Sequence, residues 1–211
     1  MDVFARIFNN SGFPVGDEFP VNAASANICA NPVVAGSSQG GFAVAWGQNE
    51  NLGLTAGSAF GVFLSGVQTT PSTNSWDIFG CLFDANGTAT TAPFRINSYT
   101  YGDQYAPQIA ALGANYMAVW TSLSQPNLVI SSSQTNLVVD PWEGVYGQWI
   151  TGSGSLVLTN DLHVNTTVIS RQIHPAVAAD GANRFLTLWS SFAPYGNFDL
   201  FAQQYFQPAG Q

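Results

Sequence analysis

The sequence is poor in charge and contains no lysine. Charged residues make up only 8% of its 211 positions, and the formal net charge at pH 7 is −8. Four scattered arginines supply the permanent positive side-chain charge: Arg6, Arg95, Arg171 and Arg184. Because nucleic-acid phosphates and anionic bilayer surfaces are bound by clustered lysine and arginine, this composition predicts neither partner.

Long apolar runs are also absent. No run reaches the roughly 18 apolar residues that a membrane-spanning helix needs, and the apolar stretch from Ala59 to Val67 is short and interrupted by glycine. We therefore expect no membrane insertion. The strand pattern begins at Asp2 with no visible signal peptide before it. This fits a mature product, an excised piece of a longer chain, or a protein exported by another route.

The sequence offers little material for metal or catalytic chemistry. Cys29 and Cys81 lack metal-ligand spacing and are expected to be isolated thiols rather than a disulfide. His163 and His174 have no evident nucleophile or metal partner, and no phosphate-binding glycine loop or zinc pattern is present. The turn that begins at Asp84 lacks the alternating acids and the distal glutamate of a calcium loop. We therefore expect no cofactor, no metal site and no enzymatic activity.

What the sequence does contain is one unit written three times in full and a fourth time in part. Each unit supplies, in order, a proline strand, a tryptophan strand, an Asp-x-Phe strand, and a Val-Asn strand that ends in a β-branched residue and asparagine. A fixed period of this kind is the signature of a repeat architecture. The Asp-x-Phe copies are Asp2–Phe8, Asp77–Phe83, Gly144–Ile150 and Asp199–Tyr205; the other markers are Asn22, Asn97 and Asn165, then Pro32, Pro107 and Pro175, then Trp46, Trp120 and Trp189.

These segments predict an all-β fold without helices. They are rich in β-branched and aromatic residues and are bounded by Gly, Asn, Pro and Ser, which is typical of short strands joined by tight turns. The fourth position of the Asp-x-Phe strand is always small, which indicates that another backbone or sheet passes close to it. We expect repeats of four-stranded antiparallel sheets arranged like the blades of a β-propeller; a β-solenoid or paired sandwiches is the alternative. The small residues are Ala5, Gly80, Gly147 and Ala202.

We expect a single repeat domain over residues 1–211. Its units run approximately over 2–76, 77–143 and 144–198, with a partial unit at 199–211. Aromatic residues that recur in register are expected to form the core. They are Phe4, Trp46, Phe79, Phe83, Trp120, Tyr146 and Trp189.

The unit resembles a known tandem repeat. The pattern Asp-x-Tyr/Phe-Gly-Gln-x-Phe-Asp-x-x-Gly, then Phe-x-Val-Asn, Pro-x-Val-Ala and Gly-Gly-Phe-x-Val-x-Trp is similar to repeats of very large bacterial and protist surface proteins. The best matches are Asp77 to Gly87, Asn97 to Ala111 and Pro32 to Trp46. The resemblance implies propeller-like blades and an extracellular or cell-surface location. Calcium-binding modules often accompany such repeats, but the few acidic loops of this sequence depart from that pattern.

An aromatic residue next to an acid marks the start of three Asp-x-Phe strands. An aromatic face beside a carboxylate can hold a sugar by stacking and by hydrogen bonds to hydroxyl groups. The same pair can be structural, with the ring wedged between sheets and the acid capping a turn. The pairs are Trp76-Asp77, Trp142-Glu143 and Phe198-Asp199, and Tyr99 and Tyr101 with the nearby Tyr105 are a weaker candidate of the same type.

Two long insertions separate tryptophan strands from Asp-x-Phe strands. Between Trp46 and Trp76 lie 29 residues and between Trp120 and Trp142 lie 21, whereas only 8 separate Trp189 from Phe198. Loops of this length are usually functional. Their apolar pieces, 59–64, 128–130 and 137–139, are expected either to pack against another chain or to fold back as an extra hairpin.

The order of the strands predicts self-association. The sequence starts and stops in the middle of a unit, and three complete units are fewer than the roughly four that close a propeller ring. Unpaired sheet edges are templates for pairing with another chain, which gives a ring or a filament. We therefore expect an extracellular, non-enzymatic structural or adhesion module that forms homo-oligomers or filaments. The alternative is a multivalent carbohydrate-binding lectin with one shallow site per repeat.

Three Asn-x-Ser/Thr sequons begin at Asn9, Asn86 and Asn165. They are acceptors for glycans if the protein passes through a eukaryotic secretory pathway.

Overall fold

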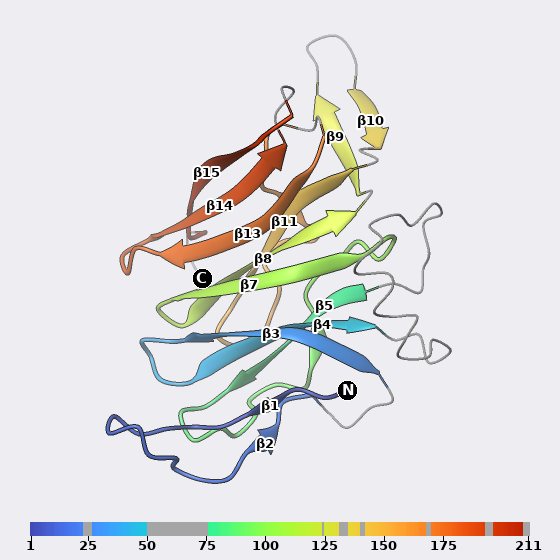
Figure 1. Cartoon of the computed structure of the whole chain (residues 1–211). Helices are drawn as coiled ribbons and strands as arrows, with labels where there is room; N and C mark the ends of the chain where they lie inside the picture. The colour runs from blue at the N-terminus through green and yellow to red at the C-terminus, as the bar shows by residue number, and fades with distance from the viewer. Residues whose placement is uncertain are drawn as a thin grey trace.

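The computed structural model contains only strands, turns and loops in the residues that it describes, namely 1–22, 27–49, 76–123, 125–130, 135–139, 142–167, 170–192 and 196–208. All of their sheets are antiparallel (Figure 1). The predicted all-β class is therefore confirmed. The apolar piece at 59–64 lies outside the described residues.

Two sheets have four strands and the next has three. In each, consecutive strands along the chain are hydrogen-bonded neighbours, except where an insertion interrupts the second sheet. The first sheet comprises β3 (Ile28–Gly36), β4 (Phe42–Asn49), β5 (Trp76–Phe83) and β6 (Phe94–Arg95). The second comprises β7 (Gln104–Leu112), β8 (Asn115–Leu123), β11 (Glu143–Ile150) and β12 (Leu162–His163). The third comprises β13 (Gln172–Ala179), β14 (Arg184–Phe192) and β15 (Phe198–Phe206).

Two further hairpins complete the described strands. At the N-terminus β1 (Phe4–Ala5) pairs with β2 (Phe19–Pro20). In the second insertion β9 (Pro126–Ile130) pairs with β10 (Thr135–Val139). The described part of this insertion therefore forms a hairpin whose two strands pair with each other.

Each sheet begins at a proline strand and continues through the tryptophan strand to the Asp-x-Phe strand, and the two four-stranded sheets end in a Val-Asn strand. A sheet thus combines the second half of one sequence unit with the first half of the next. The pair β1–β2 contains only the last two strand types. In the third sheet, β15 has no neighbour on its outer edge among the described strands.

A repeated bulge interrupts every proline strand. The residue before each repeat proline has a left-handed backbone, with φ near 53° for Asn31, 52° for Ala106 and 53° for His174. The pairing with the tryptophan strand shifts register at the same points. Proline has no N–H to give to the ladder, so the pairing breaks there and one extra residue is accommodated. A left-handed alanine is strained, and the neighbouring ladder holds it in place.

The small residue of the Asp-x-Phe strand does mark a close approach. A Cβ on Gly80 would lie 2.9 Å from Cδ1 of Ile96, and one on Gly147 would lie 3.1 Å from the carbonyl oxygen of Ala118. The close neighbours are the adjoining strands of the same sheet and their side chains. Packing within the sheet therefore leaves little room for a larger side chain at Gly80 and Gly147.

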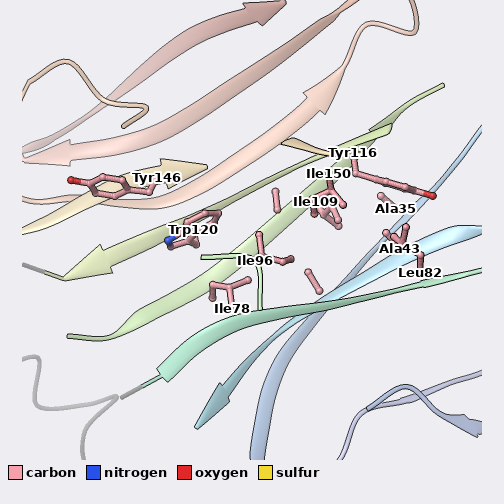
Figure 2. Packing of buried hydrophobic residues seen from close by; sticks show 12 residues of the cluster. Ala35, Ala43, Ile78, Leu82, Ile96, Ile109, Tyr116, Trp120, Tyr146 and Ile150 are labelled. Atoms are coloured by element: carbon pink, nitrogen blue, oxygen red, sulfur yellow. The ribbon is translucent and has the colours of Figure 1, made fainter. Parts of the chain in front are cut away.

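The sheets pack face to face through three apolar clusters. One cluster joins the first and second sheets, and Figure 2 shows Ile78, Ile96, Ile109 and Trp120 converging in it. A second joins the second and third sheets, and a third packs β1–β2 on the other face of the first sheet. Figure 1 shows the result as an open row, with β1–β2 at one end and β15 at the other. The described strands close no ring or barrel.

Most of the predicted core aromatics are buried, but Phe4 is not. Five of these residues are buried and Phe79 is half-buried; the buried ones are Trp46, Phe83, Trp120, Tyr146 and Trp189. The prediction for Phe4 was wrong, since 57% of this residue is exposed. The equivalent rings pair with tryptophan on the adjacent strand, as Phe79 does with Trp46 at a centroid distance of 6.4 Å. Among the described strands, β1 pairs with β2 and has no tryptophan strand beside it, so its phenylalanine lacks that partner.

A buried asparagine ties the end of each Val-Asn strand to its sheet. The Oδ1 atom accepts a hydrogen bond from a backbone N–H of the Asp-x-Phe strand. The bonds are Val3 to Asn22 at 2.7 Å, Ile78 to Asn97 at 2.7 Å and Val145 to Asn165 at 2.6 Å. Asn165 is only 1% exposed. A glycan on its sequon is therefore incompatible with this fold.

The same asparagine reaches the next sheet. The Nδ2 atom of Asn97 donates to Oε1 of Gln104 on β7 at 3.4 Å, and that of Asn165 donates to Gln172 on β13 at 3.1 Å. Gln104 and Gln172 stand at the first position of their strands. The repeat therefore joins consecutive sheets with a polar contact as well as with apolar packing.

In the first sheet the glutamine stands on the tryptophan strand β4 instead of the proline strand β3. Cys29 occupies the position of Gln104 and Gln172, and it pairs with Gln48 where the other sheets have serine. Its Sγ lies 3.6 Å from Oε1 of Gln48. A long and a short side chain have been exchanged across one strand pair, so the pair keeps a similar size. Both Cys29 and Cys81 are buried free thiols, and burial raises the pKa of each.

Trp120→Ala should lower the free energy of unfolding by about 3–5 kcal/mol, because the ring is fully buried between two sheets and its loss leaves a cavity. Chemical denaturation monitored by far-UV circular dichroism measures this cost. The control is Phe4→Ala, which should cost about 0.5 kcal/mol or less if it behaves as an ordinary surface substitution. A cost below about 1 kcal/mol for Trp120→Ala, far under the range for buried aromatics, would contradict the packing described.

Candidate functional site

The first aromatic–acid pair is buried inside the structure. Trp76 is 4% exposed, and its ring atom Cε3 lies 3.4 Å from the position that a Cβ on Gly47 would take. Asp77 is 6% exposed, and its Oδ1 accepts a hydrogen bond from Nδ2 of Asn97 at 2.7 Å. The backbone N–H of Trp76 donates to Asp103 at 3.2 Å. Both residues of this pair therefore make contacts within the protein, and the buried ring offers no free face to a sugar.

The second pair combines an exposed ring with a buried acid. Trp142 is 48% exposed and Glu143 is 6% exposed. The guanidinium of Arg171 lies 5.9 Å from the centre of the Trp142 ring, and its Nε lies 3.0 Å from Oε2 of Glu143. Burial and the Glu143 carboxylate both raise the pKa of the nearby Tyr105. An aromatic face, a carboxylate, a guanidinium and a phenol therefore gather at the junction of the second and third sheets.

The remaining predicted residues are dispersed. Phe198 is 50% exposed, and its ring centroid lies 5.2 Å from that of Phe192 in a T-shaped arrangement; Asp199 beside it is exposed. The ring centroids of Tyr99 and Tyr101 lie 6.0 Å apart, and of these two residues only Tyr101 is exposed, at 46%. Burial raises the pKa of Tyr99. The structure does not bring these residues and the other pairs into one site.

A larger feature is the uncovered outer face of the third sheet. Leu186, Leu188 and Leu200 are 38%, 36% and 79% exposed. These three residues are the third and the first before the repeat tryptophan and the second of the Asp-x-Phe strand. In the other two sheets the residues at these positions are fully buried or nearly so, and they face the next sheet in the row. These equivalents are Ala43, Ala45 and Ile78 in the first sheet and Met117, Val119 and Val145 in the second.

The apolar character of this outer face could have been predicted from the sequence of β14. Residues 185–189 read Phe-Leu-Thr-Leu-Trp. A strand with one face in water alternates apolar and polar residues, whereas this strand is apolar on both faces. Phe185 and Trp189 pack on the second sheet, and the two leucines point the other way.

The outer edge of β15 is uncovered as well. In the first sheet the N–H of Ile78 is satisfied by Asn97 and its carbonyl by the N–H of Ile96 at 2.7 Å. Leu200 is the equivalent residue of β15, and no described strand lies on that side of it. Its backbone groups are therefore a template for a further strand.

A groove opens at the opposite end of the row. It has a volume of about 470 Å³ and lies between β1 and the strands β3 and β4. Val34, which lines it, is 65% exposed. The equivalent position in the second sheet is Ile109, which is 9% exposed because the first sheet covers it. The other lining residues are mostly apolar and include Val3, Phe4, Pro32, Phe42 and Val44, with Arg6 as the charged member.

The two histidines occupy different surroundings. The ring of His163 stacks on Tyr146 with centroids 4.9 Å apart, and burial lowers the pKa of His163. His174 is exposed at a bulge. Over the described ranges, no three His, Cys, Asp or Glu residues gather where a metal ion could be held. None of the described residues belongs to a helix of the length and apolarity that crossing a membrane requires.

Comparison with known proteins adds no functional assignment. No family model matches the sequence, and no curated protein matches it. Among solved structures, one similar chain is that of a protein of unknown function from Dyadobacter fermentans DSM 18053. The identity is 13% and the TM-score 0.46, and the match covers 87% of this chain and 52% of that chain. The chain therefore spans about half the length of that protein.

Acidification should destabilise the protein through His163. Because its folded-state pKa lies below the ordinary value of 6.5, the folded state favours the neutral ring. The resulting stability is present above about pH 6.5 and is lost as the pH falls through that value toward the lower folded-state pKa.

Thermal melting between about pH 7.5 and about pH 5 measures this effect. His163→Phe keeps a ring against Tyr146 and should reduce the loss of melting temperature on acidification. His174→Asn is the matched control, because asparagine stands at the equivalent left-handed position 31. If both variants lose as much melting temperature as the wild type, His163 is not the responsible group.

Proposed function

We propose that this protein is an extracellular, non-enzymatic structural or adhesion module that assembles with copies of itself. The observation that carries the proposal is the outer face of the third sheet. It presents leucines at Leu186, Leu188 and Leu200, where the other sheets have fully buried core residues. Apolar residues that recur at a core position and lie uncovered mark an interaction surface.

The low charge of the chain supports the same proposal. Sheet edges that must stay unpaired are usually protected by charged residues, above all by lysine. This chain has no lysine, and the outer edge of β15 carries Leu200 and Ala202 with one acid, Asp199. Such an edge favours association over repulsion.

We further propose that the sheets are propeller-like blades. Support comes from the antiparallel order of consecutive strands in the two four-stranded sheets and from the face-to-face packing of the three sheets. The resemblance to repeats of bacterial and protist surface proteins supports an extracellular or cell-surface location. Copies that add further blades would close the ring, or would extend it as a filament if the rotation does not close.

Leu200→Asp should abolish self-association, because it places a charge on the uncovered face without removing buried packing. Sedimentation velocity over a range of concentrations measures the oligomeric state, and circular dichroism confirms the β fold. Leu156→Asp is the matched control, since Leu156 is 37% exposed but lies away from the third sheet, in a bridge to Ile150 at the end of β11. A wild-type protein that remains monomeric at the highest accessible concentration would contradict the proposal.

A second candidate function is carbohydrate binding at a single place. The specific observation in its favour is the Trp142–Glu143–Arg171 cluster, which combines an exposed ring with a buried carboxylate. The buried Trp76 offers no comparable site, so one site per repeat is not the arrangement that this observation supports.

If the cluster binds a sugar, a glycan array should give a signal with the wild type that Trp142→Ala removes, because the stacking face is lost. Phe13→Ala is the control, since it removes an exposed ring in the turn between β1 and β2. The absence of any wild-type signal on the array would dismiss this second function.

A further inference from the structure

We propose that the assembly is head to tail: the outer face of the third sheet of one copy seats in the groove beside β3 and β4 of a second copy. This inference rests on the proposed function, because it requires that copies associate. It goes further by naming the receiving surface and by excluding symmetric pairing of two identical faces.

The chain already makes this interface twice within itself. Where the first sheet meets the second, the residues Ala35 and Ala43 share a cluster with Ile109 and Tyr116. Where the second sheet meets the third, Ala110 and Met117 share a cluster with Val177 and Phe185. Counted from the repeat proline and tryptophan, these are the same positions. The donating face offers an alanine and a second apolar side chain that is not β-branched, and the receiving face offers a β-branched residue and an aromatic ring.

The two ends of the row hold the unmatched halves of this same interface. The third sheet presents Ala178 and Leu186 at the donating positions, and both are exposed. The first sheet presents Val34 and Phe42 at the receiving positions, and both line the groove. Each half has the residue types of its buried counterparts, so joining the ends repeats a contact that the fold makes internally.

The strand β1 defines how the incoming sheet must fit. It is an Asp-x-Phe strand and stands beside the groove, where β15 of the incoming copy would also lie. The pairing of β1 with β2 covers two residue pairs, whereas β15 pairs with β14 over nine. Because β1 is held by the shorter pairing, it leaves β2 of the receiving copy, and β15 of the incoming copy takes its place.

This exchange would give the backbone groups on the outer edge of β15 hydrogen-bond partners. Asn22 follows β2 and accepts a hydrogen bond from the N–H of Val3. After the exchange it accepts one from the N–H of Leu200, the residue of β15 that corresponds to Val3. The third sheet then gains its fourth strand, with the asparagine bond that Asn97 and Asn165 make in the other two sheets.

Two variants that each damage one half of the interface test this arrangement. Leu200→Asp carries a damaged face and an intact groove. Val34→Asp carries a damaged groove and an intact face, at a residue that is 65% exposed. Each variant alone should be monomeric. Mixed in equal amounts, they should form discrete dimers containing one copy of each, because the two ends left over are both damaged.

Native mass spectrometry with one variant labelled with ¹⁵N identifies the composition of the dimers. In the wild-type assembly, hydrogen exchange at the Leu200 amide should slow at least tenfold relative to the monomeric Val34→Asp variant, because that N–H gains a partner. Circular dichroism of each variant confirms that the fold survives.

The failure of this inference is distinct from the failure of the proposed function. If Val34→Asp assembles as the wild type does, copies associate through some other surface and the head-to-tail seat is wrong, while self-assembly stands. A mixture that stays monomeric, or a Leu200 amide that exchanges equally fast in assembly and monomer, also overturns the head-to-tail exchange. A wild type that is monomeric at all concentrations overturns both proposals.

Discussion

The stacking of sheets depends on one buried asparagine at the end of each Val-Asn strand. Its carbonyl oxygen satisfies a backbone N–H of the neighbouring strand, and in two of the three copies its amide reaches the first strand of the next sheet. A buried N–H left without a partner would cost about 1–3 kcal/mol. The short Val-Asn strands pair over only two residues, so this side chain adds to the burial of Ile96 and Val164 in holding them, and it connects them to the start of the following sheet.

The repeat tolerates change wherever a pair of residues changes together. Gln104 opposite Ser122 and Gln172 opposite Ser191 become Cys29 opposite Gln48 in the first sheet. The long side chain crosses to the other strand while the combined size of the pair stays similar, which dense interior packing demands. At the bulge before each proline, by contrast, the backbone conformation is constant while the side chain varies. Asn31, Ala106 and His174 differ widely in chemistry but share one left-handed backbone, because the following proline leaves the ladder without a donor.

The second sheet of this row is covered on both faces. The first sheet is covered on its outer face by β1–β2, beside the groove, and the third sheet has an uncovered outer face. The end faces retain the apolar character of the middle ones, as Leu186 and Leu188 on β14 demonstrate against the buried Ala43 and Ala45. Burial of a leucine stabilises by roughly 1.5–3 kcal/mol, so several such residues favour a covering partner. The proposed assembly follows from this excess of apolar surface.

The sequence by itself determined the all-β class, most turn positions and most of the core, because β-branched and aromatic segments, glycine turns and recurring tryptophans are local signals that repeat. It identified Trp46, Trp120 and Trp189 as buried for that reason. Only the tertiary structure decided which equivalent residues have neighbours. Phe4 recurs in register but lacks an adjoining tryptophan strand, and Trp76 and Trp142 look alike in sequence although only the second is exposed. Repetition fixes the identity of a position, whereas burial depends on which sheet lies against it.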